Sequence, residues 1–146
     1  MQLELKPYSA CKVLVVDDEP ISRMLLTSIL EPFVNCISAS NGEEAIDQCL
    51  MHKPDLILLD MNMPDVDGLT VCRTLKDNAD TAQIPVVFVT STIDVETENM
   101  CWEVGASDFV LKPVTASTLV HRIKNHLQGK LRTELLERLT FHDQLT

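Results

Sequence analysis

A chain of 146 residues with 45% hydrophobic and 23% charged residues has the size and composition of one folded domain, which excludes disorder over most of its length. Acidic residues number 22 against 12 lysines and arginines, giving a formal net charge of -10. This charge disfavours direct binding to nucleic acid and favours a divalent cation or a basic partner surface. No apolar run approaches the ~20 residues that cross a bilayer, and residues 1–10 lack the apolar core of a secretory signal. We therefore expect no membrane segment and a cytoplasmic location.

The five cysteines are too widely spaced for a zinc or redox pair, and their number is odd. We expect them to be small, buried, apolar residues of a protein in a reducing compartment.

The first apolar run, residues 13–16, does not alternate with polar residues, which is typical of a strand covered on both faces. A helix is predicted to begin at Pro20, because apolar residues then recur every four positions: Ile21, Leu25 and Ile29. A weaker run, 34–39, is broken by polar residues and suits the edge of a sheet. Asn41 and Glu44 have the spacing of a capping box, and they precede a helix with four apolar residues: Ala45, Ile46, Cys49 and Leu50.

The second half of the chain continues the alternation. A strand at 56–59 precedes a short helix whose apolar face is Leu69, Cys72 and Leu75. A strand at 86–89 precedes a helix from about 94 to 104, which Gly105 would terminate. A strand at 109–111 precedes a last helix, capped by Thr115, with three residues toward the core: Leu119, Ile123 and Leu127.

Five alternations of strand and helix predict an α/β fold, a doubly wound, five-stranded parallel sheet with helices on both faces. The strand order 2-1-3-4-5, which is flavodoxin-like, would place the first and third strands side by side. We expect an N-terminal extension at 1–10, the domain at 11–128, and a helical linker at 129–146 that extends the last helix toward a missing output domain. Gly129 weakens that helix by about 1 kcal/mol relative to alanine.

Polar residues follow the strands directly, at the points where each strand ends: Asp17 and Asp18, Asp60, Thr90, and Lys112. In an open parallel sheet these ends meet at one edge, where ligands bind. Three carboxylates in one pocket repel each other, so a hard cation such as Mg²⁺ is expected among them. A lysine and a hydroxyl suit the oxygens of a phosphoryl group, and a carboxylate can accept that group as an aspartyl phosphate.

The pattern resembles the receiver domain of bacterial two-component response regulators over roughly residues 11–128. Four stretches carry the resemblance: V-V-D-D-E-P at 15–20, L-L-D-M-N-M-P at 58–64, the segment P-V-V-F-V-T-S ending at Ser91, and G-A-S-D-F-V-L-K-P at 105–113. The resemblance implies a phosphoacceptor signalling module that is not itself an enzyme. Its partners would be a sensor histidine kinase or a phosphotransfer protein.

The resemblance also implies a role for each matching residue. Asp60 would be the phosphoacceptor; Asp18, Asp60 and the main-chain carbonyl of Asn62 would bind Mg²⁺, with Asp17 acting through a metal-bound water. Three further residues would form the switch, namely Lys112 paired with the phosphoryl group, Thr90 moving toward it, and Phe109 changing rotamer. The bond between Lys112 and Pro113 is expected to be cis.

Each residue alone has a simpler interpretation: Asp17 and Asp18 can cap a helix, Lys112 can be a surface charge, Thr90 an ordinary strand end and Phe109 a core residue. Two other functions compete with the receiver. An aspartate-nucleophile phosphatase would carry D-x-D at the strand end, where this chain has D-M-N, and a docking module without chemistry would not need the intact set. Met61, Met63, Trp102 and the four histidines receive no functional assignment.

The tail L-E-R-L-T-F-H-D-Q-L-T, residues 136–146, resembles the segment that leads into a diguanylate cyclase (GGDEF) domain. This implies a longer protein that makes cyclic di-GMP. Two alternatives remain open, an amphipathic helix with a chance D-Q-L-T and a linker to another output domain. Because leucines on a single helix cannot all be buried, we expect phosphorylation to favour a parallel homodimer through this tail.

Overall fold

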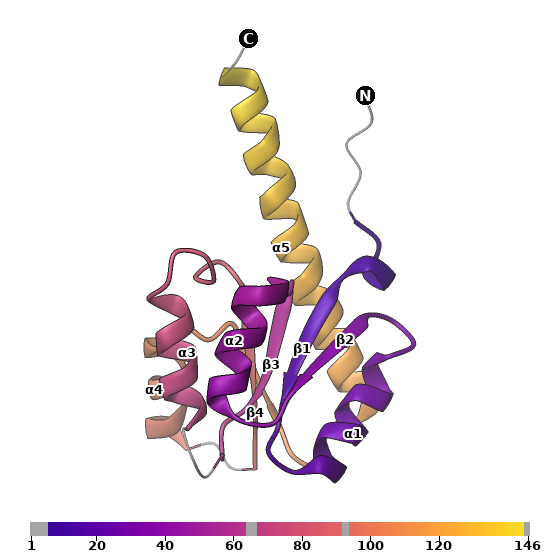
Figure 1. Ribbon diagram of the computed structural model, residues 1–146, viewed down its shortest axis with the longest axis vertical. Coiled ribbons are helices and arrows are strands. Elements are labelled where there is room, and N and C mark those ends of the chain that lie inside the picture. Colours follow the sequence, from indigo (N-terminus) through magenta and orange to yellow (C-terminus); the bar gives the residue numbers. More distant parts are fainter. Residues whose placement is uncertain (1–5, 64–66, 92–93, 145–146) are drawn as a thin grey trace.

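The computed structural model describes residues 6–63, 67–91 and 94–144, with side chains described up to residue 140. Five parallel strands form one sheet in the order β2-β1-β3-β4-β5, as predicted (Figure 1). The strands are β1 (Lys12–Val16), β2 (Asn35–Ala39), β3 (Leu56–Asp60), β4 (Val86–Thr90) and β5 (Asp108–Leu111). The helices are η1 (Tyr8–Ala10), α1 (Pro20–Leu30), α2 (Gly42–His52), α3 (Gly68–Lys76), α4 (Val95–Glu103) and α5 (Ala116–Gln144).

Helices cover both faces of the sheet, which explains why the central strands are apolar without alternation. Successive residues of β1 and β3 belong to two separate cores. Helices α2, α3 and α4 contribute to one core, and α1 and α5 contribute to the other (Figure 1). All five residues of β3 and of β4 are buried. The weaker strand β2 lies at the edge, as its polar interruptions predict.

Local signals define several helix ends as expected. Asn41 accepts a hydrogen bond from the Glu44 amide at 2.8 Å, and the Glu44 carboxylate accepts from the Ser40 amide and hydroxyl. After α4, Gly105 adopts φ 95°, and the amides of Gly105 and Ala106 donate to the carbonyls of Trp102 and Cys101. This is a Schellman termination, which glycine accommodates without strain.

The rotation of α1 differs from the apolar repeat that predicts the helix. Ile21 and Leu25 are 83% and 54% exposed, and the buried residues are Leu26 and Leu30. Both sets recur every four residues, so the sequence alone does not choose between them. In the observed rotation, Ser22 and Arg23 in the first turn of α1 donate hydrogen bonds to Asp17, a contact that the apolar repeat does not indicate.

All five cysteines are free; four are buried and Cys36 is half-buried, as expected. Burial raises the pKa of Cys49 to about 12, so this thiol stays protonated at neutral pH. No helix among the described residues is long and apolar enough to cross a membrane.

Candidate functional site at the carboxyl ends of the strands

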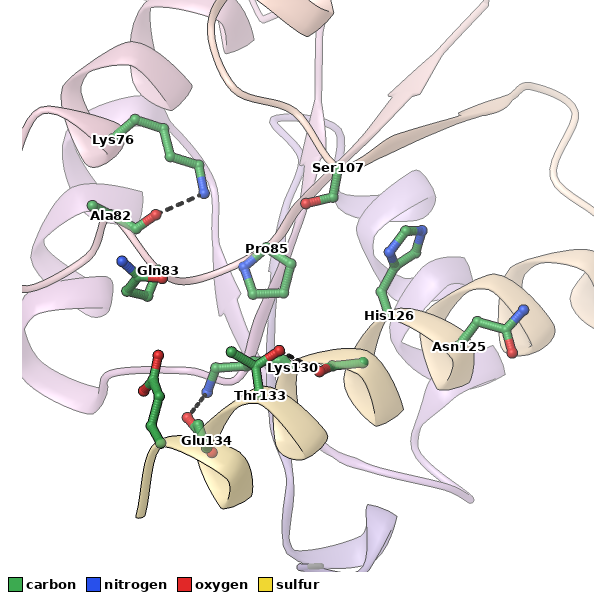
Figure 2. Close-up of a pocket in the computed structure, with 12 residues that line it drawn as sticks. Lys76, Ala82, Gln83, Pro85, Ser107, Asn125, His126, Lys130, Thr133 and Glu134 are labelled. Atoms are coloured by element: carbon green, nitrogen blue, oxygen red, sulfur yellow. Dashed lines mark hydrogen bonds and ion pairs between the residues drawn. The ribbon is translucent and has the colours of Figure 1, made fainter. Parts of the chain in front are cut away.

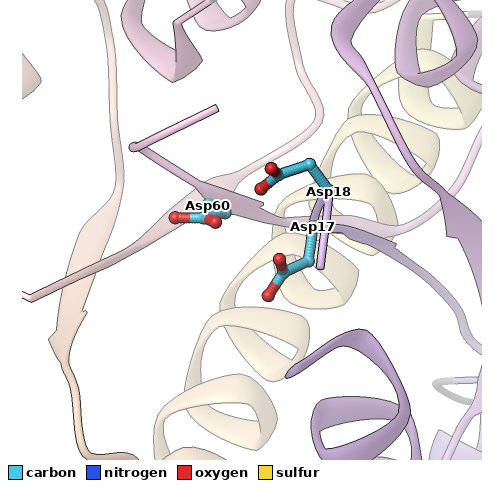
Figure 3. A group of neighbouring side chains, drawn as sticks. All are labelled: Asp17, Asp18 and Asp60. Carbon is cyan, nitrogen blue, oxygen red and sulfur yellow. The ribbon is translucent and has the colours of Figure 1, made fainter. Parts of the chain in front are cut away.

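Three carboxylates meet at the carboxyl edge of the sheet, where β1 and β3 lie side by side. Val16 pairs with Leu59 in register, so Asp17, the next residue after β1, lies level with Asp60, the last residue of β3. Each of Asp17, Asp18 and Asp60 offers an oxygen within 4.8 Å of the others (Figure 3). The topology therefore brings together residues separated by more than forty positions.

Two of these carboxylates differ in their own contacts. Asp17 is fully buried, and its carboxylate accepts hydrogen bonds from the Glu19 amide at 2.9 Å and from the Ser22 hydroxyl. Asp18 is half-buried, and no hydrogen bond from the described residues reaches its carboxylate. The Asp18 oxygens thus remain available to a ligand, whereas those of Asp17 are already engaged in holding α1.

Asp60 is 3% exposed and lies in an environment that opposes its charge. Burial raises the pKa of the Asp60 carboxyl; the Asn62 amide and Lys112 oppose the shift and the charge on Asp17 adds to it, so that the net pKa lies above its ordinary value. The Asn62 amide donates to Asp60 Oδ1 at 3.1 Å, and Lys112 Nζ lies 3.5 Å from the same oxygen. A positive charge added at this edge would stabilise the ionised carboxylate.

The ends of β4 and β5 supply the remaining predicted residues. Thr90, the last residue of β4, is 1% exposed, and its carbonyl accepts from the Lys112 amide at 2.8 Å. Lys112 directly follows β5, and its peptide bond to Pro113 is cis. Phe109, in the middle of β5, is half-buried. Asn62 is exposed beside the cluster, and a role for its carbonyl stays a prediction.

Two residues with no predicted role, Gly68 and Trp102, belong to this region. A Cβ at Gly68 would lie 2.8 Å from the Asp60 carbonyl oxygen and 2.9 Å from Met61 Cα, so only glycine lets α3 begin this close to the end of β3. Trp102 on α4 packs against Phe109 in a tilted arrangement, with ring centroids 5.6 Å apart and an interplanar angle of 53°. The D-G step at 67–68 is a sequence signal for Gly68, but no spacing rule links Trp102 to Phe109.

The donor set fits a hard divalent cation. It consists of carboxylate oxygens alone, two of the three groups are buried, and burial, with the charge on Asp17 adding to it, raises the pKa of Asp60. Oxygen ligands of this kind suit Mg²⁺, which is held by one or two carboxylates together with waters and phosphate oxygens. Among the described residues no other cluster of three carboxylate, imidazole or thiol groups has this geometry.

Comparison with known proteins assigns the family. The model of the response regulator receiver domain matches residues 13–124. The chain is 34% identical over 134 residues to the probable cyclic di-GMP phosphodiesterase of Vibrio cholerae, covering 92% of this chain and 30% of that protein. It is 37% identical over 123 residues to the response regulator PleD of Caulobacter vibrioides, covering 84% and 27%. The chain therefore spans less than a third of the length of either relative.

A solved structure gives the same result. The signal receiver domain of a putative Luxo repressor protein from Vibrio parahaemolyticus has a TM-score of 0.82 at 26% identity, covering 88% of this chain and 98% of that one. The doubly wound sheet with acidic residues at its carboxyl edge defines a signalling module of the CheY-like fold. The chain belongs to the response regulator receiver domain family.

Proposed function

We propose that Asp60 is the phosphoacceptor of this receiver and that a histidine kinase or phosphotransfer protein supplies the phosphoryl group. The observation that carries the proposal is the environment of Asp60, a buried carboxylate at the strand end with an amine at 3.5 Å and two further carboxylates within 4.8 Å. A carboxylate held only for stability would have partners that lower its pKa. The raised pKa of Asp60 indicates that the groups around it do not fully compensate its negative charge, so that a bound cation would stabilise it.

In the transfer step, an Asp60 oxygen attacks phosphorus and a P–O bond forms as the P–N bond to the donor imidazole breaks. The electron pair of that bond returns to the imidazole nitrogen, so no oxidant or further reactant is needed. Lys112 would pair with one oxygen of the transferred group, and the Asn62 amide would hold the carboxylate in place. Asp18, Asp60 and the Asn62 carbonyl would hold Mg²⁺, with Asp17 acting through a metal-bound water. This ion would neutralise the negative charge between carboxylates and phosphoryl oxygens.

The bound phosphoryl group adds about -1.5 to -2 charge and strong acceptor oxygens. We expect Thr90 to move toward it and Phe109 to turn inward behind Thr90. Phe109 would then leave its contact with Trp102, which changes the surface formed by α4, β5 and α5.

The output of this switch is an enzyme of cyclic di-GMP metabolism in our proposal. The tail at 136–146 favours a diguanylate cyclase, although Leu145 and Thr146 of its motif lie outside the described residues. The match to the Vibrio cholerae protein favours a second candidate, a cyclic di-GMP phosphodiesterase. Expression of the full-length protein distinguishes them, because one consumes GTP and the other consumes cyclic di-GMP. The cytoplasmic location remains a prediction.

We propose that phosphorylation acts through dimerisation of α5. Leu136 and Leu139 are 62% and 37% exposed beyond the sheet, and Leu135 is half-buried. Sedimentation with and without beryllofluoride, a phosphoryl mimic, tests this, with Leu136→Ala/Leu139→Ala as the variant. We expect a dimer with the mimic that the double substitution removes, and a chain that stays monomeric in every condition contradicts the proposal.

Incubation with acetyl phosphate and Mg²⁺ tests the function class by intact mass and phosphate release over time. A single phosphoryl adduct supports the receiver if its lifetime is many times longer than one catalytic cycle of a phosphatase. Continuous release of phosphate without an adduct supports an aspartate-nucleophile phosphatase, and the absence of both supports a docking module.

A further inference from the structure

Helix α5 leaves the domain at the end of the sheet opposite the acidic site (Figure 1). We call its residues 129–144 the exit helix. The helix is continuous across this boundary, and its buried stripe does not stop at Leu127. Leu131 is 4% exposed and belongs to the same core as Leu127. The first turn of the exit helix is therefore packed against the domain.

Gly129 makes this boundary the weakest point of the helix. A Cβ built there meets nothing within 4 Å beyond the neighbouring turns of the helix, so no packing requires glycine at this position. Glycine in a helix interior costs conformational entropy that alanine does not. A helix that must transmit a change from the domain to a following segment has its least stable residue at the point of exit.

On one side of the exit helix a cavity of about 550 Å³ lies where the domain would otherwise pack against it. Figure 2 shows the cavity between the helix, which contributes Thr133 and Glu134, and the segment that leads into β4, which contributes Gln83 and Pro85. The segment before β4 is held by its own contacts, since Lys76 Nζ donates to the carbonyls of Ala82 and Ile84. It therefore stands away from the exit helix.

Lys130, one residue after Gly129, makes the polar contacts that hold the exit helix. Its Nζ lies 3.1 Å from Asp55 Oδ1 and 2.8 Å from Glu134 Oε1 (Figure 2 draws the Glu134 pair). The Lys130 side chain is 14% exposed and that of Asp55 is 6% exposed, so both charges are largely removed from water. Asp55 immediately precedes β3, the strand that ends in Asp60.

We infer that Lys130 is a positioning residue: its ion pair with Asp55 holds the exit helix straight across Gly129 and fixes its direction to the strand that carries the phosphoacceptor. Burial alone would lower the pKa of Lys130, but Glu134 and Asp55 raise it above its ordinary value, so the lysine stays charged. The consequence for output rests on the proposed function, whereas the contact itself does not.

Amide hydrogen exchange by NMR on the unphosphorylated 146-residue chain tests the contact. Lys130→Met retains most of the side-chain volume and removes the charge. We expect exchange at residues 131–135 to rise by at least about threefold, with residues 119–127 unchanged. Arg132→Met is the matched control, because Arg132 is exposed and has no ion pair with a described residue. Adding Gly129→Ala to Lys130→Met should slow exchange at 131–135 again, since alanine stiffens the helix and has room.

Three results overturn the inference. Unchanged exchange at 131–135 in Lys130→Met means that Leu131 holds the helix alone. An equal rise over 119–127 means that the pair stabilises the whole domain and does not position the exit helix. Failure of Gly129→Ala to slow exchange means that Gly129 is not the weak point.

Sedimentation with beryllofluoride and Mg²⁺ tests the consequence for output. If the unsubstituted chain dimerises on adding the mimic, Lys130→Met should lose most of that response while Arg132→Met keeps it. An undiminished response in Lys130→Met contradicts the positioning role. If the unsubstituted chain itself does not respond, the proposed dimerisation through α5 fails, and the exchange experiment still decides the contact.

Discussion

The two ends of β3 carry buried aspartates with opposite environments. Asp55 before the strand is 4% exposed and Asp60 at its end is 3% exposed; they lie about 16 Å apart along an extended chain. Asp55 accepts from Lys6 at 2.9 Å, from the Lys12 amide at 2.8 Å and from Lys130 at 3.1 Å. Asp60 accepts from the Asn62 amide at 3.1 Å and has Lys112 Nζ at 3.5 Å, and the charge on Asp17 opposes its own.

The difference between these aspartates appears in their pKa values. Burial raises the pKa of both, but the Lys12 amide, Lys6 and Lys130 bring that of Asp55 below its ordinary value. The pKa of Asp60 remains raised. Burial alone therefore does not mark a functional carboxylate; the deficit of positive charge around it does. One end of the strand pairs with Lys130 of the exit helix, and the other end is, in the proposed function, the one that binds a cation and a phosphoryl group.

The largest expected effect tests the deficit of positive charge around Asp60. Asp18→Ala should lower the rate of labelling by acetyl phosphate at least about 100-fold, because a ligand of the cation is lost. EDTA should have the same effect on the unsubstituted chain. Asp17→Ala should lower labelling less and stability more, since Asp17 holds α1. Labelling rates that are equal with and without EDTA contradict a metal site.

Removing the charge at the Asp55 end should cost stability. Asp55→Asn breaks a largely buried ion pair with Lys130 and a second pair with Lys6, which is 42% exposed. We expect a loss of about 2–3 kcal/mol in the free energy of unfolding at pH 7. Because the folded-state pKa of Asp55 is lowered, this stabilisation is present above the unfolded pKa of about 3.9 and is lost as pH falls through the folded value. Urea unfolding from pH 7 to pH 3 measures this stabilisation. Asp47→Asn, at an exposed position of α2, is the control. If the free energy of unfolding of Asp55→Asn differs from that of the unsubstituted chain by the same amount at every pH, the stabilisation does not come from the ionised Asp55 carboxylate.

The corresponding change at the other end should have the opposite sign. The folded-state pKa of Asp60 is raised, so its charge destabilises the fold as pH rises from the unfolded pKa through the folded value. Asp60→Asn removes the repulsion with Asp17 and should stabilise the metal-free chain by about 1 kcal/mol at pH 7, with less gain at pH 4. Urea unfolding in EDTA measures this gain. A destabilised Asp60→Asn chain would show that Asp60, like Asp55, is held by favourable partners.

The smallest expected effect is optical. Trp102 is the only tryptophan; it is 43% exposed and packs at a tilt against Phe109. Beryllofluoride with Mg²⁺ should shift its emission to longer wavelength, because inward rotation of Phe109 leaves the indole more exposed to water. Phe109→Leu should shift the emission without the mimic. If beryllofluoride with Mg²⁺ shifts the emission of Asp60→Asn by the same amount, the fluorescence change does not depend on the acidic site.

The five strands could be predicted from their apolar runs. The convergence of Asp17, Asp18 and Asp60 could be predicted from their positions at strand ends, once the flavodoxin-like order places the first and third strands side by side. The rotation of α1 could not, since two apolar sets in that helix have the same spacing. The pair between Asp55 and Lys130 joins residues 75 positions apart, and each charge alone resembles an ordinary surface residue. Contacts of this kind depend on where helices pack, which periodicity does not specify.

Chemical trapping of the acceptor tests the central claim most directly. The chain is incubated with acetyl phosphate and Mg²⁺ and reduced with borohydride, which converts an aspartyl phosphate to homoserine, and the peptides are then mapped by mass spectrometry. The account predicts homoserine at position 60, none at position 55, and none anywhere in Asp60→Asn. Homoserine at Asp17 or Asp18 in the unsubstituted chain, or a full adduct on Asp60→Asn, would contradict it.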